Sequence, residues 1–280
     1  KGHPLYELDK AVKFMNLRYD DSSQDFDGWI WKWKKIQKEF IRAFAGADMM
    51  ICGHHIEDPK KMYFFDEFAK RLKRIIVENP PDLIIIISAD GAYIVQKAIE
   101  DRGIPVIAMC HTDPGQFVDS FSEQQIIAWK KCAYVQVLMD SFIPVLKNIG
   151  IRNVVSIANV VSQIPDDEIR DLSNEHNRII TVGRIDGSVK RQDLLIKAFS
   201  CVSAKYTKWT LHIYGDIANR HYMRNLTGFV EENNLKERVF FEGVTDDVFA
   251  CFQNTDIFAF PSRYEGFGLA MAEAMSAGLP

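Results

Sequence analysis

Cysteine is scarce in this sequence and follows no pattern. The 280 residues contain five cysteines, at positions 52, 110, 132, 201 and 251, and no Cys-x-x-Cys pair. An odd and scattered set argues against a disulfide framework and against a cysteine-ligated zinc site, and it favours a reducing cytoplasm. Long apolar runs are also missing. The longest aliphatic run covers residues 83–87, far short of the roughly 20 residues that a membrane span needs.

An excess of positive charge is absent as well. Lys and Arg number 34 against 38 Asp and Glu, for a formal net charge of −4. A protein that binds duplex nucleic acid needs a basic surface to neutralise phosphates, so we expect no nucleic-acid partner. The Gly-x-Gly-x-x-Gly fingerprint of NAD enzymes, the P-loop and the His-Glu-x-x-His zinc motif are all missing.

One motif suggests a metal and is set aside. Asp25-x-Asp27 matches the Asp-x-Asp pattern by which some transferases bind a divalent cation. It follows no buried strand, however, and it precedes a helical pattern, so Asp27 is better explained as a helix N-cap. We therefore expect no metal and no cofactor beyond the substrates themselves.

What the sequence does contain is an alternation of short apolar runs with amphipathic segments. Residues 83–87, Leu-Ile-Ile-Ile-Ile, are apolar at every position, which is typical of a strand buried on both faces of a parallel sheet. A polar, acidic stretch at 158–177 interrupts the alternation, and a second series follows. We therefore predict an α/β fold with two Rossmann-like, doubly wound domains facing a cleft, residues 1–160 and 161–280.

The alternation places the elements as follows. Strands are predicted at 12–17, 48–52, 83–88, 106–110, 135–139, 154–157, 179–183, 210–214, 239–242 and 257–260. Helices are predicted at 28–45, 60–78, 92–102, 122–131, 141–149, 192–204, 221–233, 246–253 and 269–277.

The segment 261–278 carries the first candidate chemistry. Gly266 and Gly268 follow a predicted strand and permit a tight turn, and a helix that begins near Gly268 would direct its free N–H groups at an anion. Glu265 lies in the turn and Glu273 lies in the helix, roughly 7–8 Å further along its axis. The two carboxylates are therefore placed to contact different parts of one extended ligand.

The segment 181–199 contains a second group of candidate ligand-binding residues. Arg184 directly follows a predicted strand, and Lys190 and Arg191 precede the next helix. Cations beyond the carboxyl end of a strand suit a diphosphate, although Arg191 has an alternative partner in Asp193.

Together these segments resemble the C-terminal domain of glycosyltransferase family 4, also called glycosyl transferases group 1. The resemblance covers about a hundred residues, through 182–199, 209–216 and 239–280, and the family's Glu-x7-Glu signature falls on Glu265 and Glu273. It implies the GT-B fold and a retaining transfer of a sugar from a nucleotide sugar. The first strand and Gly-rich loop of the family are not recognised here, and its last elements would follow Pro280, so we interpret the chain as a fragment.

The resemblance also implies roles for individual residues. Glu265 would contact hydroxyl groups of the donor sugar, and Glu273 would hold the ribose. Arg184 and Lys190 would neutralise the diphosphate. The remaining implied positions are Gly266, Phe267 and Gly268 as backbone donors to the diphosphate, Gly215 near the nucleotide, Gly243 and Val244 near the base, and His111 near the donor sugar.

The expected function is the transfer of a hexose from a nucleotide sugar, with UDP as the nucleotide, to a glycan or lipid-linked acceptor in cell-surface polysaccharide biosynthesis. The expected location is the cytoplasm, with possible contact at the membrane periphery. Two alternatives stay open. One is a GT-B sugar-nucleotide epimerase or hydrolase, which needs the same diphosphate site, and the other is a non-catalytic GT-B module that binds a partner.

The predicted helix 28–44 has two interpretations. Trp29, Trp33, Ile36, Phe40 and Phe44 form one stripe along it, and lysines occupy its other faces. The commoner meaning of such a stripe is the core face of a surface helix, which is the interpretation we favour. A basic helix with tryptophans also suits a membrane interface, which would fit a lipid-linked acceptor.

Overall fold

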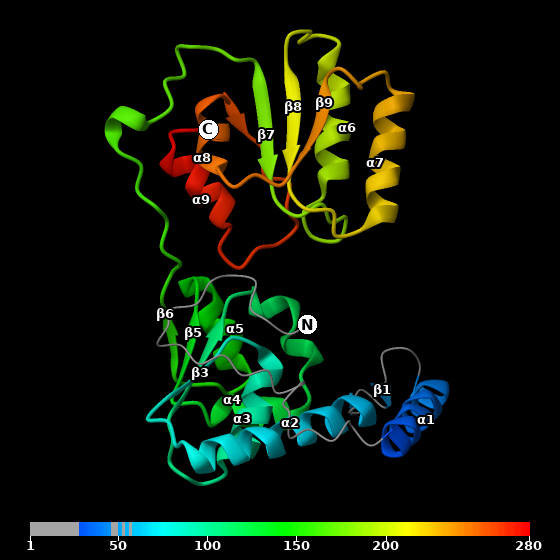
Figure 1. Ribbon diagram of the computed structural model, residues 1–280, viewed down its shortest axis with the longest axis vertical. Helices are drawn as coiled ribbons and strands as arrows, with labels where there is room; N and C mark the ends of the chain where they lie inside the picture. Colours follow the sequence, from blue (N-terminus) through cyan, green and yellow to red (C-terminus); the bar gives the residue numbers. More distant parts are fainter. Residues whose placement is uncertain (1–27, 46–49, 52–53, 56–57) are drawn as a thin grey trace. The chain divides into compact units, whose positions relative to one another are not determined.

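The computed structural model describes residues 28–45, 50–51, 54–55 and 58–280 (Figure 1). The chain divides into two compact units, Lys1–Ile157 and Ala158–Pro280, and each contains a four-stranded sheet. The strand predicted at 12–17 and the Asp25-x-Asp27 motif lie outside the described residues. The α/β fold class predicted from the sequence is confirmed.

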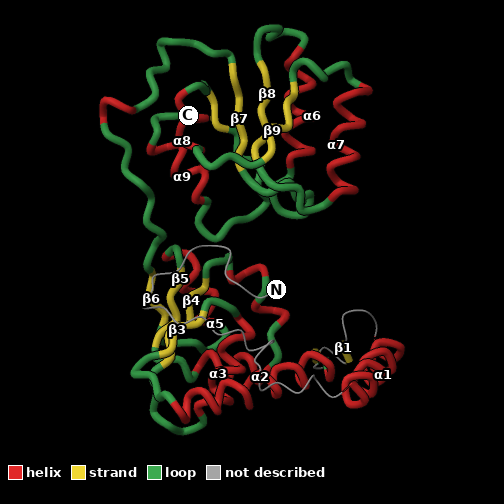
Figure 2. The backbone as a smooth tube through the Cα atoms, in the orientation of Figure 1, coloured by secondary structure: helices red, strands yellow, loops and turns green. Residues whose placement is uncertain are grey.

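The sheet of the first unit is parallel, in the order β3-β4-β5-β6, with helices around it (Figure 2). Its strands are β3 (Ile84–Ile86), β4 (Val106–Cys110), β5 (Tyr134–Val137) and β6 (Val154–Ser156). Its helices are α1 (Gly28–Ala45), α2 (Pro59–Glu78), α3 (Ala89–Ile99), α4 (Glu123–Lys130) and α5 (Ile143–Asn148), and β1 (Met50–Ile51) and β2 (His54–His55) form a separate antiparallel pair.

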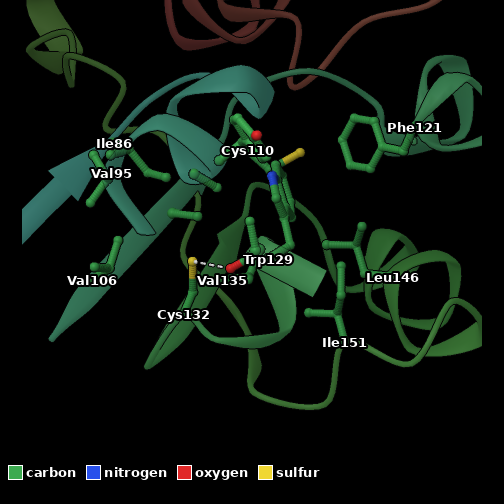
Figure 3. Close-up of a cluster of buried hydrophobic side chains, with 14 of the residues drawn as sticks. Ile86, Val95, Val106, Cys110, Phe121, Trp129, Cys132, Val135, Leu146 and Ile151 are labelled. Atoms are coloured by element: carbon green, nitrogen blue, oxygen red, sulfur yellow. Dashed lines mark hydrogen bonds between the residues drawn. The ribbon is translucent and has the colours of Figure 1, made fainter. Parts of the chain in front are cut away.

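The core of the first unit gathers around Trp129, whose ring packs against Phe121 at a centroid distance of 5.4 Å (Figure 3). Cys132 lies in the same cluster, and its thiol donates a hydrogen bond to the carbonyl of Ala128 at 3.6 Å. Burial raises the pKa of the Cys110 and Cys132 thiols to about 11. Both therefore stay protonated at neutral pH and act as small core residues.

The apolar run 83–87 is not buried on both faces, and that prediction is wrong. Leu83, Ile85 and Ile87 are 43%, 57% and 75% exposed, while Ile86 is buried. Successive side chains of a strand point to opposite faces, so the exposed residues share one face. β3 lies at the end of the described strand order, and the face with these three side chains is only partly covered by the described residues.

The aromatic stripe of α1 also differs from the favoured interpretation. Trp33, Ile36 and Phe40 are 51%, 58% and 66% exposed, so this stretch of the helix does not turn its apolar side to a core. The side chains of Trp29 and Phe44 lie outside what the structure describes.

The sheet of the second unit is also parallel, but its order is β10-β7-β8-β9. Its strands are β7 (Arg178–Val182), β8 (Thr210–Tyr214), β9 (Val239–Gly243) and β10 (Ile257–Phe258), and its helices are α6 (Gln192–Ser203), α7 (Arg220–Glu232), α8 (Val248–Gln253) and α9 (Leu269–Ser276). One apolar cluster includes Ile196, Leu211 and Leu226, and another includes Ile180, Phe252 and Ala274.

The polar segment 158–177 belongs to this second unit and holds one short 3-10 helix, Asp166–Glu168. Arg170 fixes it. The Arg170 guanidinium is almost fully buried, donates to the Thr255 carbonyl at 2.9 Å and pairs with Asp256 at 2.9 Å. The segment is therefore tied to the beginning of β10 by a buried ion pair.

Candidate functional site

The candidate site lies where the strand order of the second sheet reverses. The chain runs from β7 to β8 and β9 on one side, and β10 then pairs with β7 on the other. In parallel sheets of this kind, ligands bind beyond the carboxyl ends of the two strands at the reversal. The loops that follow β7 and β10 meet there, because the N–H of Arg263 donates to the carbonyl of Val189 at 2.8 Å.

Lys190 and Glu265 face each other across these two loops. The Lys190 ammonium lies 2.5 Å from Glu265 Oε1, and both side chains are partly buried. The same ammonium lies 5.6 Å from the centre of the Phe260 ring. A cation over an aromatic face is stabilised by the ring quadrupole. Glu265 and Phe260 therefore both hold the Lys190 ammonium beyond the carboxyl end of β10.

Gly268 begins α9 in the left-handed region, with φ +81°. No side chain caps this helix end, and an added Cβ would lie 3.4 Å from two atoms of the Phe260 ring. The uncapped first turn leaves backbone N–H groups and the positive end of the helix dipole for an anion. Phe260 thus lies beside both the cation and the helix start.

The loop after β7 is held by residues that sequence reasoning missed. Gln192 is buried, donates to the Arg184 carbonyl at 3.0 Å and accepts from the Asp186 N–H at 3.3 Å. Ser188 donates twice to Asp186, from its hydroxyl at 2.6 Å and its N–H at 2.8 Å, and these bonds hold the pKa of Asp186 below its usual value. The available signal was a polar Gln at the first position of the helix face that also carries Ile196 and Phe199.

The two arginines of this loop behave differently from Lys190. The side chain of Arg184 is 63% exposed, and its nearest carboxylate is Asp186 at 3.7 Å. Arg191 has left-handed backbone at the start of α6 and pairs with Asp193 at 3.3 Å, as its alternative interpretation predicted. Tyr222 also donates to Asp193, at 2.9 Å. Arg184 is therefore the more available of the two for an anion.

Glu273 lies in α9 and is partly buried. Among the described residues its carboxylate has no hydrogen bond and no ion pair. Gly266 and Phe267 are partly buried in the loop that leads to α9. This carboxylate, in the helix that begins after Gly268, therefore remains available to a ligand.

The glycines that end β7 and β8 allow a very close backbone approach. Gly215 has φ +149°, and an added Cβ would lie 2.1 Å from the Gly183 carbonyl oxygen. The Gly215 N–H donates to the carbonyl of Gly243, at the end of β9, at 2.7 Å. Val244 follows and is 70% exposed. The three glycines thus bring the carboxyl ends of these strands together next to the loop of Lys190.

His111 belongs to the first unit, exposed and directly after β4. Its role near a donor sugar stays a prediction, as do the individual roles of the residues in the second unit. Across the described parts of both units, no group of three or more His, Cys, Asp or Glu side chains is arranged to hold a metal ion.

Comparison with known proteins points to glycosyltransferases. Residues 176–280 match the family described as Glycosyl transferases group 1. An uncharacterized glycosyltransferase of Haemophilus influenzae is 26% identical over 229 residues, which cover 79% of this chain and 61% of the relative. A poly(ribitol-phosphate) alpha-N-acetylglucosaminyltransferase of Staphylococcus aureus is 30% identical over 138 residues, 49% of this chain and 26% of the relative.

The fold has solved counterparts among glycosyltransferases. The pneumococcal O-GlcNAc transferase GtfA, solved in complex with UDP and GlcNAc, superposes with a TM-score of 0.61 at 18% identity, over 75% of this chain and 44% of that protein. This likeness shows the fold, which is that of GT-B glycosyltransferases. The chain spans about three fifths of the length of the Haemophilus relative. The part of the chain that is similar to glycosyl transferases group 1, residues 176–280, includes Lys190, Glu265 and Glu273.

Proposed function

We propose that this chain is the donor-binding part and a portion of the acceptor-binding part of a retaining, metal-independent glycosyltransferase. It transfers a hexose from a UDP-sugar to a glycan or lipid-linked acceptor of a cell-surface polysaccharide. The observation that carries the proposal is the Lys190–Glu265 pair at the reversal of the strand order, beside the uncapped start of α9.

The chemistry of the pair supports a phosphate–sugar junction. An ammonium suits phosphate oxygens, and a carboxylate accepts hydrogen bonds from sugar hydroxyls. The two groups lie 2.5 Å apart. A ligand that contacts both must therefore carry a phosphate group directly next to a sugar ring. That description fits the bond between the diphosphate and C1 of an activated sugar.

The proposed reaction needs no group outside the substrates and these side chains. The bond from C1 to the diphosphate oxygen breaks, and the acceptor oxygen forms a bond to C1 on the same face of the sugar. The acceptor proton passes to the leaving diphosphate. Lys190, Arg184 and the start of α9 stabilise the charge that develops on the diphosphate, an effect typically worth about 3–4 kcal/mol of the barrier per donor.

The implied roles of the other residues complete the site. Glu273 binds the ribose, since its carboxylate has no partner among the described residues. Gly215, Gly243 and Val244 lie by the nucleotide, and His111 lies by the donor sugar. UDP is supported by the neighbouring structure that contains UDP and GlcNAc, and the acceptor class by the relative named as a poly(ribitol-phosphate) alpha-N-acetylglucosaminyltransferase.

The test is a screen of nucleotide sugars by thermal shift on the full-length protein. A ligand that binds only the folded state raises the melting temperature of the protein. We therefore expect the donor to be the nucleotide sugar that gives the largest increase. Product analysis with donor alone and with donor plus acceptor separates the alternatives. Free sugar or an altered nucleotide sugar without acceptor favours a hydrolase or epimerase. No stabilisation by any UDP-sugar or by UDP overturns the proposal.

A further inference from the structure

Helix α1 presents an exposed apolar face. Trp33, Ile36 and Phe40 are each more than half exposed. At 100° per residue they lie within a stripe about 60° wide. With Gln37 and Pro59 they line a shallow hollow of about 540 Å³. Exposed aromatic side chains grouped on one helix face mark a surface that binds something apolar.

The opposite face of the helix holds it to the rest of the first unit. Lys38 forms an ion pair with Asp58, and Asp58 in turn accepts from the N–H of Lys60 at 2.9 Å as the N-cap of α2. Lys38 lies about 140° around the helix from Trp33. This ion pair lies on the side of the helix away from Trp33, Ile36 and Phe40, which are more than half exposed although Pro59 borders their hollow.

Positive charge is concentrated on the same helix. Residues 28–45 hold five cationic side chains and one carboxylate, a net charge of +4, in a chain whose formal net charge is −4. All the other residues together therefore carry −8. Lys32 and Lys34 lie about 100° to either side of Trp33, so cations flank the apolar stripe. A surface with hydrocarbon at its centre and cations at its edges is complementary to an anionic lipid headgroup layer.

We propose that α1 binds the surface of an anionic phospholipid bilayer. The helix lies parallel to the membrane plane, with Trp33, Ile36 and Phe40 at the boundary between headgroups and acyl chains and the lysines at lipid phosphates. A soluble polyanion would satisfy the lysines, but it offers no hydrocarbon to the three apolar side chains. Among the described residues no helix is long and apolar enough to cross a membrane, so this contact is peripheral.

The experiment is flotation of the full chain with lipid vesicles at low ionic strength. We expect the chain to float with vesicles of phosphatidylcholine and phosphatidylglycerol mixed two to one, and to stay at the bottom with pure phosphatidylcholine. Salt at about 0.5 M, which shortens the Debye length, should weaken the binding. The assay contains no sugar donor, so its outcome is independent of the proposed transferase function.

Two variants test the two components. K32E/K34E should lower the partition coefficient at least tenfold, because one lysine near an anionic surface changes it about fivefold. I36S/F40S should lower it about tenfold through lost apolar burial. K205E/K208E and L194S/V202S make the same changes at exposed positions of the second unit and should float like the original chain.

Circular dichroism of each variant confirms that it is folded before it is compared. The original chain also tests the proposal alone, without any variant. Failure to float with the anionic vesicles at low salt overturns it, as does equal loss of flotation in the α1 variants and their controls. Binding to soluble polyphosphate with no flotation would identify α1 as a polyanion surface, which also overturns it.

Discussion

The ammonium of Lys190 lies 2.5 Å from Oε1 of Glu265, although 75 positions separate the two residues. Lys190 precedes α6 and Glu265 precedes α9, and the parallel pairing of β7 with β10 brings their loops to one edge of the sheet. The ammonium has three N–H donors, so a donor phosphate that binds Lys190 competes with this carboxylate for them. Binding of the diphosphate at Lys190 would thus release the Glu265 carboxylate to accept hydrogen bonds from the sugar.

Replacement of Lys190 by methionine should weaken UDP binding about tenfold or more, because a charge-assisted hydrogen bond to phosphate is lost while the aliphatic stem is kept. Isothermal titration with UDP measures the change. K197M alters an exposed lysine of α6 away from the pair and is the matched control. Equal UDP affinity in K190M and in the original protein would place the diphosphate elsewhere.

The two carboxylates should separate into different roles. E265Q should lower sugar transfer about a hundredfold and leave UDP affinity at its original level or tighter, since Lys190 loses its competing carboxylate. E273A should weaken UDP itself about tenfold through the lost ribose contact. Titration with UDP and an assay of transfer, run on both variants, give the comparison. The assignment is contradicted if E265Q loses UDP and E273A keeps it.

Replacement of Gly215, at the end of β8, should lower the free energy of unfolding, whereas replacement of Gly228, within α7, should not. G215A would place a Cβ 2.1 Å from the Gly183 carbonyl oxygen, so we expect a loss of roughly 3 kcal/mol or more in the free energy of unfolding. G228A lies within α7 and meets nothing within 4 Å, so it should stabilise by about 0.5–1 kcal/mol. Urea unfolding of both variants checks the sign of each change.

Removal of one partner from the buried ion pair of Arg170 with Asp256 should lower the free energy of unfolding much more than removal of one partner from a surface pair. Asp256 also accepts from the N–H groups of Arg178 and His176, and although burial opposes them, these bonds hold its pKa below the usual value. R170M leaves this carboxylate buried without its cation, which should cost about 3–5 kcal/mol.

The matched control for that variant is K236A, which breaks an exposed pair with Glu231 at 2.8 Å. It should change stability by less than about 1 kcal/mol. Chemical denaturation measures both, and a small effect in R170M would show that water reaches the site after the guanidinium is removed.

The second unit should lose stability in mild acid through His212. Burial lowers the pKa of this imidazole below its ordinary 6.5, against the opposing effect of Glu242, whose Oε1 lies 2.5 Å from Nδ1. The unfolded chain then binds the proton more readily than the folded one. The contribution of His212 is therefore complete above about pH 6.5 and declines as the pH falls below it.

Unfolding measured in urea across this pH range tests the effect of His212. H212Q should flatten the dependence, while H221Q, at an exposed position of α7, should keep it. A curve for H212Q parallel to that of the original protein would assign the pH dependence to another group.

The elements of this protein follow from local pattern. The strands 106–110 and 210–214 and the helix 28–45 coincide with their predicted bounds. The reason is that an apolar period of two residues indicates a strand and a period of 3.6 residues indicates a helix. The candidate site was recognisable for a similar reason. Glycines next to charged residues at the end of a strand form a pattern within a few positions, and Glu265 and Gly268 are part of it.

Exposure was decided by the tertiary structure alone. The run 83–87 and the stripe of α1 have the composition of buried segments, yet Ile85 and Phe40 are mostly exposed. Whether an apolar face is covered depends on which elements pack on it, and no local pattern contains that information. The same holds for Lys190 with Glu265, because this contact exists only after the parallel strands β7 and β10 align their carboxyl ends.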